Sequence, residues 1–499
     1  MPWLAVGAAV IATALAYPPL ALPGLGLVML APLVYALDSL EPRSAFFASW
    51  LYSLSFALIG VQWLVYALVF EYRVSALPAG LFALLVVGGL AAVPGAAAAC
   101  YAALAPRLGA VGAPLAFAAI WMLGEWVRAA GLGVPWLLAA QTFARIPLAI
   151  QGADLGGTYA VGFVAAAVGA GLGIAVRRRQ ARALAMPALL AAGALGYGAW
   201  RLTAPAPQAG TVRIGVVQAS VPQRDRFQPG SAARNTARHI EATRALLGHQ
   251  PLDLVVWSET AIDTDLDLTP SLRSSLEQLA RETRVPLVTG APRSEGGRRT
   301  NSVVLIEPER GLAESYAKQV LVPWSEYDPA LGGLLAPLIG PVTEGAPYVA
   351  GQLPTVFRSG PIPFATPVCF EITYPELIRR FRERGADLLV NLSNDAWFGP
   401  VGFPQMHLAH AIFRAVETRS WVVRGANTGI SAAIDPAGRV VAEIPAFREG
   451  TLVAEVWPAG PRPPYARLGD APVLAVLVAV LLLTLARTRR RSDRHRDEP

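Results

Sequence analysis

Lysine occurs once in this chain, at position 318, although 42 residues are lysine or arginine. A lysine amine forms a compact point charge and can lose its proton when desolvated, whereas arginine stays charged and presents a rigid fork of donors. The single lysine is therefore either a chance survivor of a strong arginine bias or a residue kept for its chemistry. Its neighbours, Tyr316-Ala-Lys-Gln-Val-Leu-Val-Pro-Trp-Ser-Glu-Tyr327, favour the second interpretation.

Cys369 stands where a predicted strand, Pro363–Val368, ends and a predicted helix, Thr373–Arg384, begins. A nucleophile at such a turn is exposed at the strand edge, and the N-terminus of the following helix is expected to lower the pKa of the thiol. A lone cysteine is more often a small buried hydrophobic residue. We assign that simpler role to Cys100, which lies in an Ala-rich apolar run.

Glu259 follows the predicted strand Asp253–Trp257. A carboxylate just beyond a buried strand can serve as a general base, although many such acids are merely solvated. Glu259, Lys318 and Cys369 each lie near a predicted strand end. We therefore expect them to act together in one domain.

The elements that would position these residues are short strands rich in Val and Ile, with helices between the earlier ones. The predicted strands are Arg213–Ala219, Asp253–Trp257, Pro286–Thr289, Ser302–Ile306, Pro363–Val368, Asp387–Leu392, Val422–Ala426, Ser431–Ile434, Val440–Ile444 and Leu452–Val456. The predicted helices are 231–247, 271–283, Thr373–Arg384 and Gln405–Ser420. Alternating strands and helices with a β-rich end predict a layered α/β domain over 211–458, after a linker at Ala204–Gly210.

The rest of the chain has the composition of a membrane protein. Hydrophobic residues make up 54% and charged residues 15% of the sequence, against about 25% charged in typical soluble chains. Two cysteines in 499 residues exclude a disulfide framework. We expect about eight spans, seven within 1–200 and one within 470–488, before a basic tail at 489–499. The predicted spans are 3–17, 20–37, 45–68, 79–104, 113–130, 157–176, 183–200 and 471–486.

Two short segments carry the whole net charge of +7. Residues 177–182 include four arginines and no acid, and the tail from Arg487 onward holds six arginines against three acids. Both segments flank apolar runs, which is typical of a topology signal and not of a nucleic-acid-binding face. The positive-inside rule then predicts a cytoplasmic N-terminus and tail. It places 201–470 on the outer side of the membrane, which in a bacterium is the periplasm.

Polar residues at the end of the fifth predicted span need separate interpretation. Glu125 and Arg128 are one helical turn apart, so we expect an ion pair at the membrane interface. The segment 137–156 is too polar for a span and is predicted to form a re-entrant or interfacial arm, with Trp136 as an interface anchor. The glycines of Gly169-Ala-Gly-Leu-Gly173 are predicted to pack helices together.

Several motifs resemble the nitrilase superfamily, whose triad is Glu-Lys-Cys. They are Trp257-Ser-Glu-Thr260, Lys318 followed by Leu321-Val-Pro-Trp-Ser-Glu-Tyr327, Val368-Cys-Phe-Glu371 and Asn391-Leu-Ser-Asn-Asp-Ala-Trp-Phe-Gly399. With spans on both sides, and with Asn394-Asp-Ala-Trp-Phe398 in particular, the chain is similar to the apolipoprotein N-acyltransferase family of that superfamily. The resemblance implies an α-β-β-α sandwich beside a multi-pass helical membrane domain, in the bacterial inner membrane.

The resemblance also implies a mechanism. Glu259 would take the proton of Cys369, which would attack an ester of a phospholipid, typically phosphatidylethanolamine, to form a thioester. Lys318 would stabilise the oxyanion. The α-amine of the S-diacylglyceryl cysteine of an apolipoprotein would then accept the acyl chain. No cofactor and no nucleic acid are implied.

Further residues take supporting roles by the same resemblance. Glu326 and Glu371 would position the lysine and the cysteine loop, although solvated or ion-paired carboxylates remain the alternative. Trp397 and Phe398 would belong to a mobile loop that contacts lipid, with core aromatics as the alternative. Asn394 would order that loop.

Phe370 and Phe227 depart from the family pattern, since tyrosine and tryptophan are frequent at those positions. Phe370 and Trp136 are also expected to support the site or contact substrate. His407 and His410 have a spacing that suits a metal, but we identify no acidic or thiol partner nearby in the sequence and predict no metal site.

Two other functions remain open from the residues. A membrane-anchored amidohydrolase would use the same triad, but one span would suffice to anchor it. A transporter or scaffold with a binding domain is the other, although polar or broken helices at mid-membrane are typical of transporters.

Overall fold

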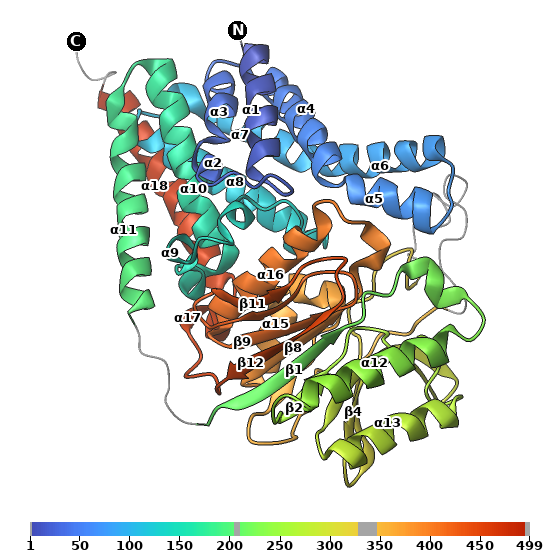
Figure 1. The fold of residues 1–499 in the computed structure, drawn as a ribbon. Helices are drawn as coiled ribbons and strands as arrows, with labels where there is room; N and C mark the ends of the chain where they lie inside the picture. The colour runs from blue at the N-terminus through green and yellow to red at the C-terminus, as the bar shows by residue number, and fades with distance from the viewer. Residues whose placement is uncertain (1, 204–209, 328–346, 495–499) are drawn as a thin grey trace. The chain divides into compact units, whose positions relative to one another are not determined.

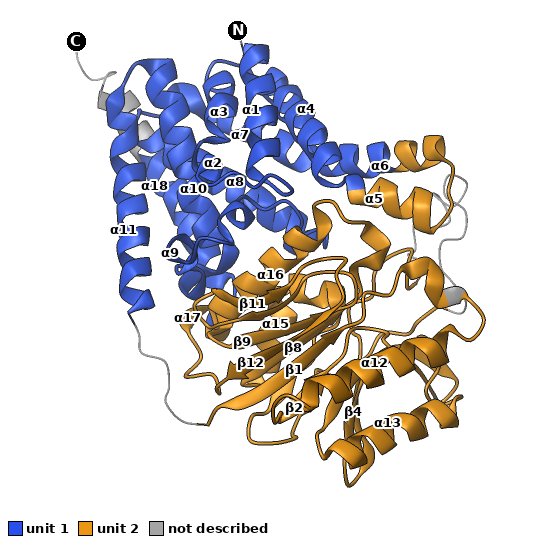
Figure 2. Ribbon diagram, in the orientation of Figure 1, with its two compact units in different colours: residues 1–62, 83–204, 468–499 blue, residues 63–82, 205–467 orange. Residues whose placement is uncertain are grey.

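The structure is a computed structural model that describes residues 2–203, 210–327 and 347–494. Its contacts divide the chain into two units, a helical unit and an α/β unit (Figure 2). The helical unit comprises 1–62, 83–204 and 468–499, and the α/β unit comprises 63–82 and 205–467. The predicted linker lies almost entirely outside the described residues, as does the end of the basic tail.

The helical unit consists of apolar helices of very different lengths (Figure 1). They are α1 (Pro2–Ala16), α2 (Leu25–Val28), α3 (Ala31–Leu37), α4 (Pro42–Gly60), α7 (Ala92–Leu104), α8 (Gly112–Trp126), α9 (Pro147–Ile150), α10 (Ala153–Arg178), α11 (Ala185–Leu202) and α18 (Ala471–Arg494), with α6 (Ala76–Leu90) divided between the units. Helix α10 packs on α3 and α8.

Among the described residues, three helical stretches are long and apolar enough to cross a membrane: Ala76–Arg107, Ala153–Arg178 and Ala181–Leu202. A fourth candidate is the pair Pro42–Gly60 and Gln62–Glu71, which is bent by 54° at a break. Shorter apolar helices cover Pro2–Ala16, Leu25–Leu37 and Ala471–Ala486. The count of about eight spans therefore stays a prediction.

The glycines of α10 allow close helix packing, as expected. A Cβ atom at Gly173 would lie 2.4 Å from the carbonyl oxygen of Ala31 at the start of α3, so only glycine fits there. Cys100 differs from expectation, because its side chain is exposed on α7. Its Ala-rich helix turns that face outward from the helical unit, so the apolar sequence alone gave the wrong burial.

Glu125 and Arg128 brace the polar arm that follows α8. Glu125 is buried and accepts a hydrogen bond from the backbone N–H of Ala139 at 3.1 Å. Arg128 donates to the carbonyl oxygens of Val134 and Trp136. These bonds turn both side chains toward the arm. Trp136 is 7% exposed, so its side chain is not displayed as the interface anchor that the sequence predicted.

The α/β unit contains two six-stranded sheets. The first has the order β12-β1-β2-β3-β4-β5 and the second β11-β10-β9-β8-β7-β6. The strands are β1 (Val212–Gln218), β2 (Leu254–Val256), β3 (Leu287–Glu295), β4 (Arg298–Glu307), β5 (Gly311–Ala317), β6 (Val356–Phe357), β7 (Phe364–Ala365), β8 (Leu388–Ser393), β9 (Trp421–Ala426), β10 (Ser431–Ile434), β11 (Val440–Ile444) and β12 (Gly450–Val456). The principal helices are α12 (Ser231–Leu247), α13 (Pro270–Thr283), α15 (Pro375–Glu383) and α16 (Phe403–Thr418).

The two sheets pack face to face, with helices on their outer sides (Figure 1). Gly425 of β9 faces Val256 of β2, where an added Cβ would lie 3.1 Å from a valine methyl carbon. Helices α12 and α13 pack on β1 and β4 of the first sheet, and α16 packs on β9 and β10 of the second. The predicted α-β-β-α layering is thus confirmed for this unit.

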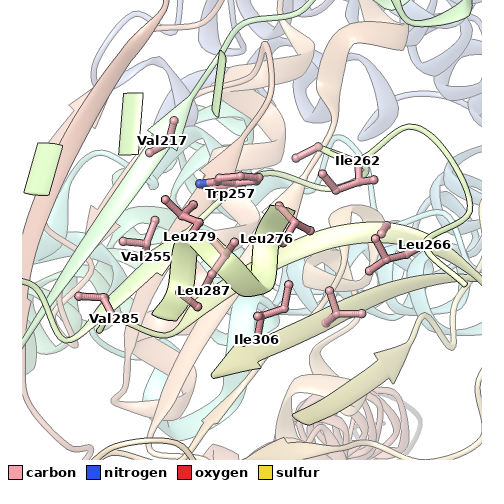
Figure 3. Packing of buried hydrophobic residues seen from close by; sticks show 14 of the residues in the cluster. Val217, Val255, Trp257, Ile262, Leu266, Leu276, Leu279, Val285, Leu287 and Ile306 are labelled. Atoms are coloured by element: carbon pink, nitrogen blue, oxygen red, sulfur yellow. The ribbon is translucent and has the colours of Figure 1, made fainter. Parts of the chain in front are cut away.

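A core of apolar side chains joins α12 and α13 to the first sheet (Figure 3). Trp257 is fully buried at its centre, and its indole N–H donates to Thr243 of α12 at 2.9 Å. Leu276, Leu279 and Leu287 pack in the same cluster. Burying each such side chain stabilises the fold by about 1.5–3 kcal/mol. The core thereby fixes the end of β2, three residues before Glu259.

The structure corrects three details of the predicted strands. Strand β5 was not predicted, because the half-exposed sequence Gly311–Ala317 lacks the Val/Ile run of the others. Pro363–Val368 forms only the two-residue strand β7, followed by an isolated bridge from Val368 to β8. Proline cannot donate to a ladder, which shortens the pairing. Cys369 opens a 3₁₀ turn, Cys369–Thr373, and α15 begins after it.

Candidate active site

Cys369 is the first residue of the 3₁₀ turn that follows β7, and its backbone is strained. Its φ of +49° is in the left-handed region, which costs a non-glycine residue about 1–3 kcal/mol. The residue is 5% exposed. Burial, with a further contribution from Glu259, raises the pKa of the thiol, and Lys318 opposes this only in part. The expected lowering of the pKa by a helix N-terminus is wrong, because the turn is short and the thiol is desolvated.

Lys318 is held between two carboxylates. It follows β5 directly, and its ammonium Nζ lies 3.2 Å from Glu259 Oε1 and 3.0 Å from Glu326 Oε1. All three side chains are buried. Burial by itself would lower the pKa of Lys318, but Glu259 and Glu326 outweigh it and hold this pKa well above its usual value. Lys318 is therefore a fixed cation.

Asn301 is a member of this cluster that the sequence did not reveal. Its side-chain amide donates to Glu259 Oε1 at 2.9 Å and to Glu326 Oε1 at 2.7 Å. The backbone carbonyl oxygen of Asn301 accepts a hydrogen bond from the backbone N–H of Lys318 at 2.9 Å, because β4 and β5 are neighbours in the first sheet. The predicted strand Ser302–Ile306 began one residue after Asn301, so the sequence did not place this asparagine in the sheet, whereas β4 includes it.

Glu371 joins the lysine segment to the cysteine turn. Its Oε1 accepts the Tyr316 hydroxyl at 2.8 Å and the backbone N–H of Gln319 at 2.6 Å, and its Oε2 accepts that of Val368 at 2.7 Å. Burial raises the pKa of Glu371 to about 7, against the lowering effect of these hydrogen bonds. The carboxyl group thus connects residues on both sides of the site.

The site contains a cavity of about 150 Å³ within the α/β unit. Cys369, Lys318, Glu259 and Glu326 all border it. Gly290 of β3 permits the close approach of the Glu259 backbone, because a Cβ there would lie 2.7 Å from Glu259 Cα. The cavity brings together a thiol, buried carboxylates and the ammonium of Lys318, and Arg226 and Arg299 also line it.

Asn394 connects the next loop to this cluster. Its backbone N–H donates to Glu259 Oε2 at 2.8 Å, and its side chain accepts the N–H of Ala396 at 3.3 Å. The side-chain amide also donates to Gln223 at 3.2 Å. Asn394 thus orients both the carboxylate of Glu259 and the short 3₁₀ helix Asp395–Phe398.

Trp397 and Phe398 also line the cavity, and both contact the 63–82 segment of the α/β unit. Trp397 stacks on Tyr72 at 5.0 Å between ring centroids, and Phe398 makes an edge contact with Trp63 at 5.3 Å. The Tyr72 hydroxyl donates to Ser325 at 2.7 Å. The sequence placed 63–82 in and beside predicted spans, so these contacts were not foreseen.

His407 lies next to Cys369 and Asp395, contrary to the expectation that no acid or thiol is nearby. The potential ligand atoms of these three residues lie within 4.8 Å of one another. Arg424 binds Asp395 at 2.9 Å and also approaches His407 Nδ1 at 3.0 Å. A fixed guanidinium in the middle of the group repels a cation, so the donor set does not fit a metal ion. The sequence concealed this proximity because the residues belong to different elements.

The remaining predicted residues have simpler surroundings. The Phe370 ring makes an edge contact with Tyr374 at 5.1 Å. His410 is buried one turn beyond His407 on α16. The side chain of Phe227 lies outside the described residues. Trp136 belongs to the helical unit, so its part in the site stays a prediction.

A buried thiol, an ammonium and buried carboxylates thus meet at one cavity of the α/β unit. Residues 213–460 match the carbon-nitrogen hydrolase family, and residues 9–171 match the apolipoprotein N-acyltransferase N-terminal domain. Among solved structures, an E41L mutant of the amidase from Nesterenkonia sp. AN1 is 20% identical with a TM-score of 0.40. The match covers 54% of this chain and 98% of that one.

Relatives of similar length share both parts of the chain. The apolipoprotein N-acyltransferase of Azotobacter vinelandii is 34% identical over 497 residues, covering 96% of this chain and 93% of the relative. That of Pseudomonas aeruginosa is 31% identical over 490 residues, covering 94% and 93%. This chain belongs to the apolipoprotein N-acyltransferase family, within the nitrilase superfamily.

Proposed function

We propose that the protein transfers a fatty acyl chain from a phospholipid to the α-amine of the N-terminal S-diacylglyceryl cysteine of apolipoproteins. The observation that carries this proposal is the cavity shared by Cys369 and the buried Lys318–Glu259–Glu326 cluster. Family membership supports the choice of lipoproteins as acceptors. Phosphatidylethanolamine is the proposed acyl donor.

In the first half-reaction Glu259 accepts the Cys369 proton as the sulfur attacks the ester carbonyl carbon. Cys369 needs this base because burial raises the pKa of its thiol and leaves little thiolate at neutral pH. The cationic Lys318 stabilises the oxyanion that develops. The ester C–O bond then breaks, Glu259 returns the proton to the leaving alkoxide, and a lysophospholipid departs from the thioester.

In the second half-reaction the α-amine of the acceptor attacks the thioester carbonyl carbon. Glu259 takes a proton from the amine, the C–S bond breaks, and the proton returns to the Cys369 sulfur. Glu326 keeps Lys318 charged and in place through its contact with the ammonium. Asn301 in turn donates a hydrogen bond to Glu326. The product is an amide, and the enzyme returns to its starting state.

The membrane setting supports this chemistry. The arginines at 177–182 and in the tail are proposed to face the cytoplasm of a bacterium, with the α/β unit in the periplasm. Both proposed substrates are lipids anchored in the inner membrane, so a multi-pass enzyme would meet them in one leaflet. Trp397 and Phe398 border the cavity and are proposed to contact an acyl chain.

The test is the intact mass of the full-length protein after incubation with phosphatidylethanolamine and no acceptor. We expect a gain of one acyl group, absent from the Cys369→Ala variant and discharged by a diacylglyceryl peptide with a free amine. Discharge by water as fast as by the peptide would instead indicate a hydrolase. An absence of any adduct with phospholipid would overturn the proposal and favour a binding domain.

A further inference from the structure

A buried polar group lies behind the nucleophile and is not used by the proposed mechanism. It consists of Asp395 in the 3₁₀ helix after β8, His407 on α16 and Arg424 on β9. The side chains of all three are 0% exposed. Burying two charges and an imidazole is costly unless each is paired. The cost suggests that the group has a function beyond packing.

His407 contacts the backbone of the nucleophile directly. Its Nε2 lies 3.0 Å from the carbonyl oxygen of Cys369. A carbonyl oxygen can only accept a hydrogen bond. Nε2 must therefore carry the proton and donate it, whichever state the other ring nitrogen adopts.

The other side of the ring is clamped. Nδ1 of His407 lies 3.0 Å from Asp395 Oδ1 and 3.0 Å from Arg424 Nη2. Arg424 also donates to Asp395 Oδ2 at 2.9 Å and to the carbonyl oxygen of Ile430 at 3.1 Å. Gly429 encloses the group, because a Cβ there would lie 2.1 Å from Asp395 Oδ2. The ring has one orientation available to it.

The bond to Cys369 acts on the most constrained peptide of the site. The left-handed φ of Cys369 is unfavourable, so the turn needs contacts that hold it. In a trans peptide, the N–H of Phe370 points opposite to the Cys369 carbonyl. Fixing the carbonyl toward His407 therefore fixes that N–H in the opposite direction and holds the backbone that carries the Cys369 side chain.

We propose that His407 is a positioning residue, which holds the peptide plane between Cys369 and Phe370 so that the thiol meets the acyl carbon in a productive geometry. The inference rests on the proposed nucleophilic role of Cys369. Burial, with Arg424, lowers the pKa of His407, so the ring stays neutral and is suited to hold the turn and not to exchange protons.

Two amide substitutions at His407 distinguish the role of ring nitrogen Nε2 from that of Nδ1. The amide nitrogen of His407→Gln takes the place of Nε2 and can still donate to the Cys369 carbonyl. That of His407→Asn takes the place of Nδ1 and cannot reach it. His410→Gln, one turn away on the same buried helix, is the matched control. His407→Met is a second variant that fills the space without donating.

The measurement is the single-turnover rate of acylation of the full-length protein by phosphatidylethanolamine in vesicles. We expect His407→Asn and His407→Met to lose about 100-fold in this rate with unchanged KM, because small misplacements of reacting groups cost this much. We expect His407→Gln to stay within about tenfold of the wild type, and His410→Gln to match the wild type. Equal loss in the Gln and Asn variants, or no loss in Asn and Met, would overturn the proposal.

A second measurement separates this inference from the proposed function. In a Cys100→Ser background only Cys369 can react with iodoacetamide, since the chain has two cysteines. His407→Asn should change the alkylation rate of Cys369, and His407→Gln should restore it. If the wild type formed no thioester, the proposed function would fail, and the alkylation series would still decide the role of His407. If alkylation were the same in every variant, the positioning role would be wrong.

Discussion

Two groups of buried acidic side chains, one in each unit, pair with basic side chains in different ways. In the helical unit, Asp38 meets Arg178 at 2.6 Å and accepts the Tyr101 hydroxyl at 2.9 Å. In the α/β unit, Glu259 and Glu326 share the single cation Lys318. The first arrangement balances one negative charge with one positive charge. The second places two carboxylates on one ammonium beside the Cys369 thiol, in a cavity that Arg226 and Arg299 also line.

This difference shows which buried charges can do chemistry. A balanced pair gains nothing from accepting a proton, so it fixes helices and remains as it is. Where two carboxylates share one ammonium, one of them can take a proton during a reaction while the other still pairs with the ammonium. The Lys318 cluster also borders a cavity, where a substrate can reach it.

The largest expected effect comes from Glu259→Gln. We expect acyl transfer to fall by about 10⁴-fold or more, because the thiol loses its base. Glu259 also raises the pKa of Cys369 by its charge, so its removal should lower that pKa. The alkylation of Cys369 should then reach its midpoint at a lower pH than in the wild type. A variant with less transfer but a more acidic thiol would separate base catalysis from simple thiolate formation, whereas an unshifted pH profile would contradict the electrostatic argument.

Glu326→Gln should give a smaller loss. It leaves Lys318 and Glu259 as a balanced pair, like Asp38 and Arg178. We expect kcat to fall by about 10²-fold because Lys318 loses one of the two carboxylates that hold it for the oxyanion, while the Gln oxygen can still accept from Asn301. Steady-state kinetics and thermal unfolding of the purified protein would check this. Unchanged kcat would show that the second carboxylate on Lys318 is unimportant.

The smallest effect on activity is expected from Arg178→Met in the helical unit. Asp38 would stay buried without its cation, which destabilises the protein by about 3 kcal/mol. The specific activity of the folded fraction should remain within about twofold of the wild type, since the pair does no chemistry. A lower midpoint of thermal unfolding with normal kcat is the expected result. A large loss of kcat would show that the two kinds of buried charge are not functionally distinct.

Much of the α/β unit was predictable from local patterns. The predicted helix 231–247 coincides with α12 and the predicted strand Ser431–Ile434 with β10, because amphipathic and Val/Ile-rich periodicities report burial directly. Strand β5 was missed because its residues are half-exposed. The α-helix expected soon after Cys369 starts after a 3₁₀ turn. Turn types of this kind depend on contacts such as that between Glu371 and the backbone of Val368.

Some residues of the candidate site were likewise predictable from the sequence, and others were not. Glu259 and Cys369 were found from their positions after predicted strands and from motifs, and Lys318 from its being the single lysine and from its motif; the structure places all three around one cavity. Asn301 and His407 were missed or given no role. Their contacts join positions that lie 42 and 38 residues apart in the sequence, which no local pattern records.

The sequence by itself determined the membrane character, the α/β domain and the three residues proposed to carry the reaction. These follow from composition, periodicity and residue identity, all of which are local properties. Only the tertiary structure decided the burial of the Cys369 thiol, the sharing of Lys318 by two carboxylates and the contact of His407 with the cysteine backbone. The physical reason is that desolvation and charge pairing depend on which distant groups meet in space, and packing of the two sheets is what brings them together.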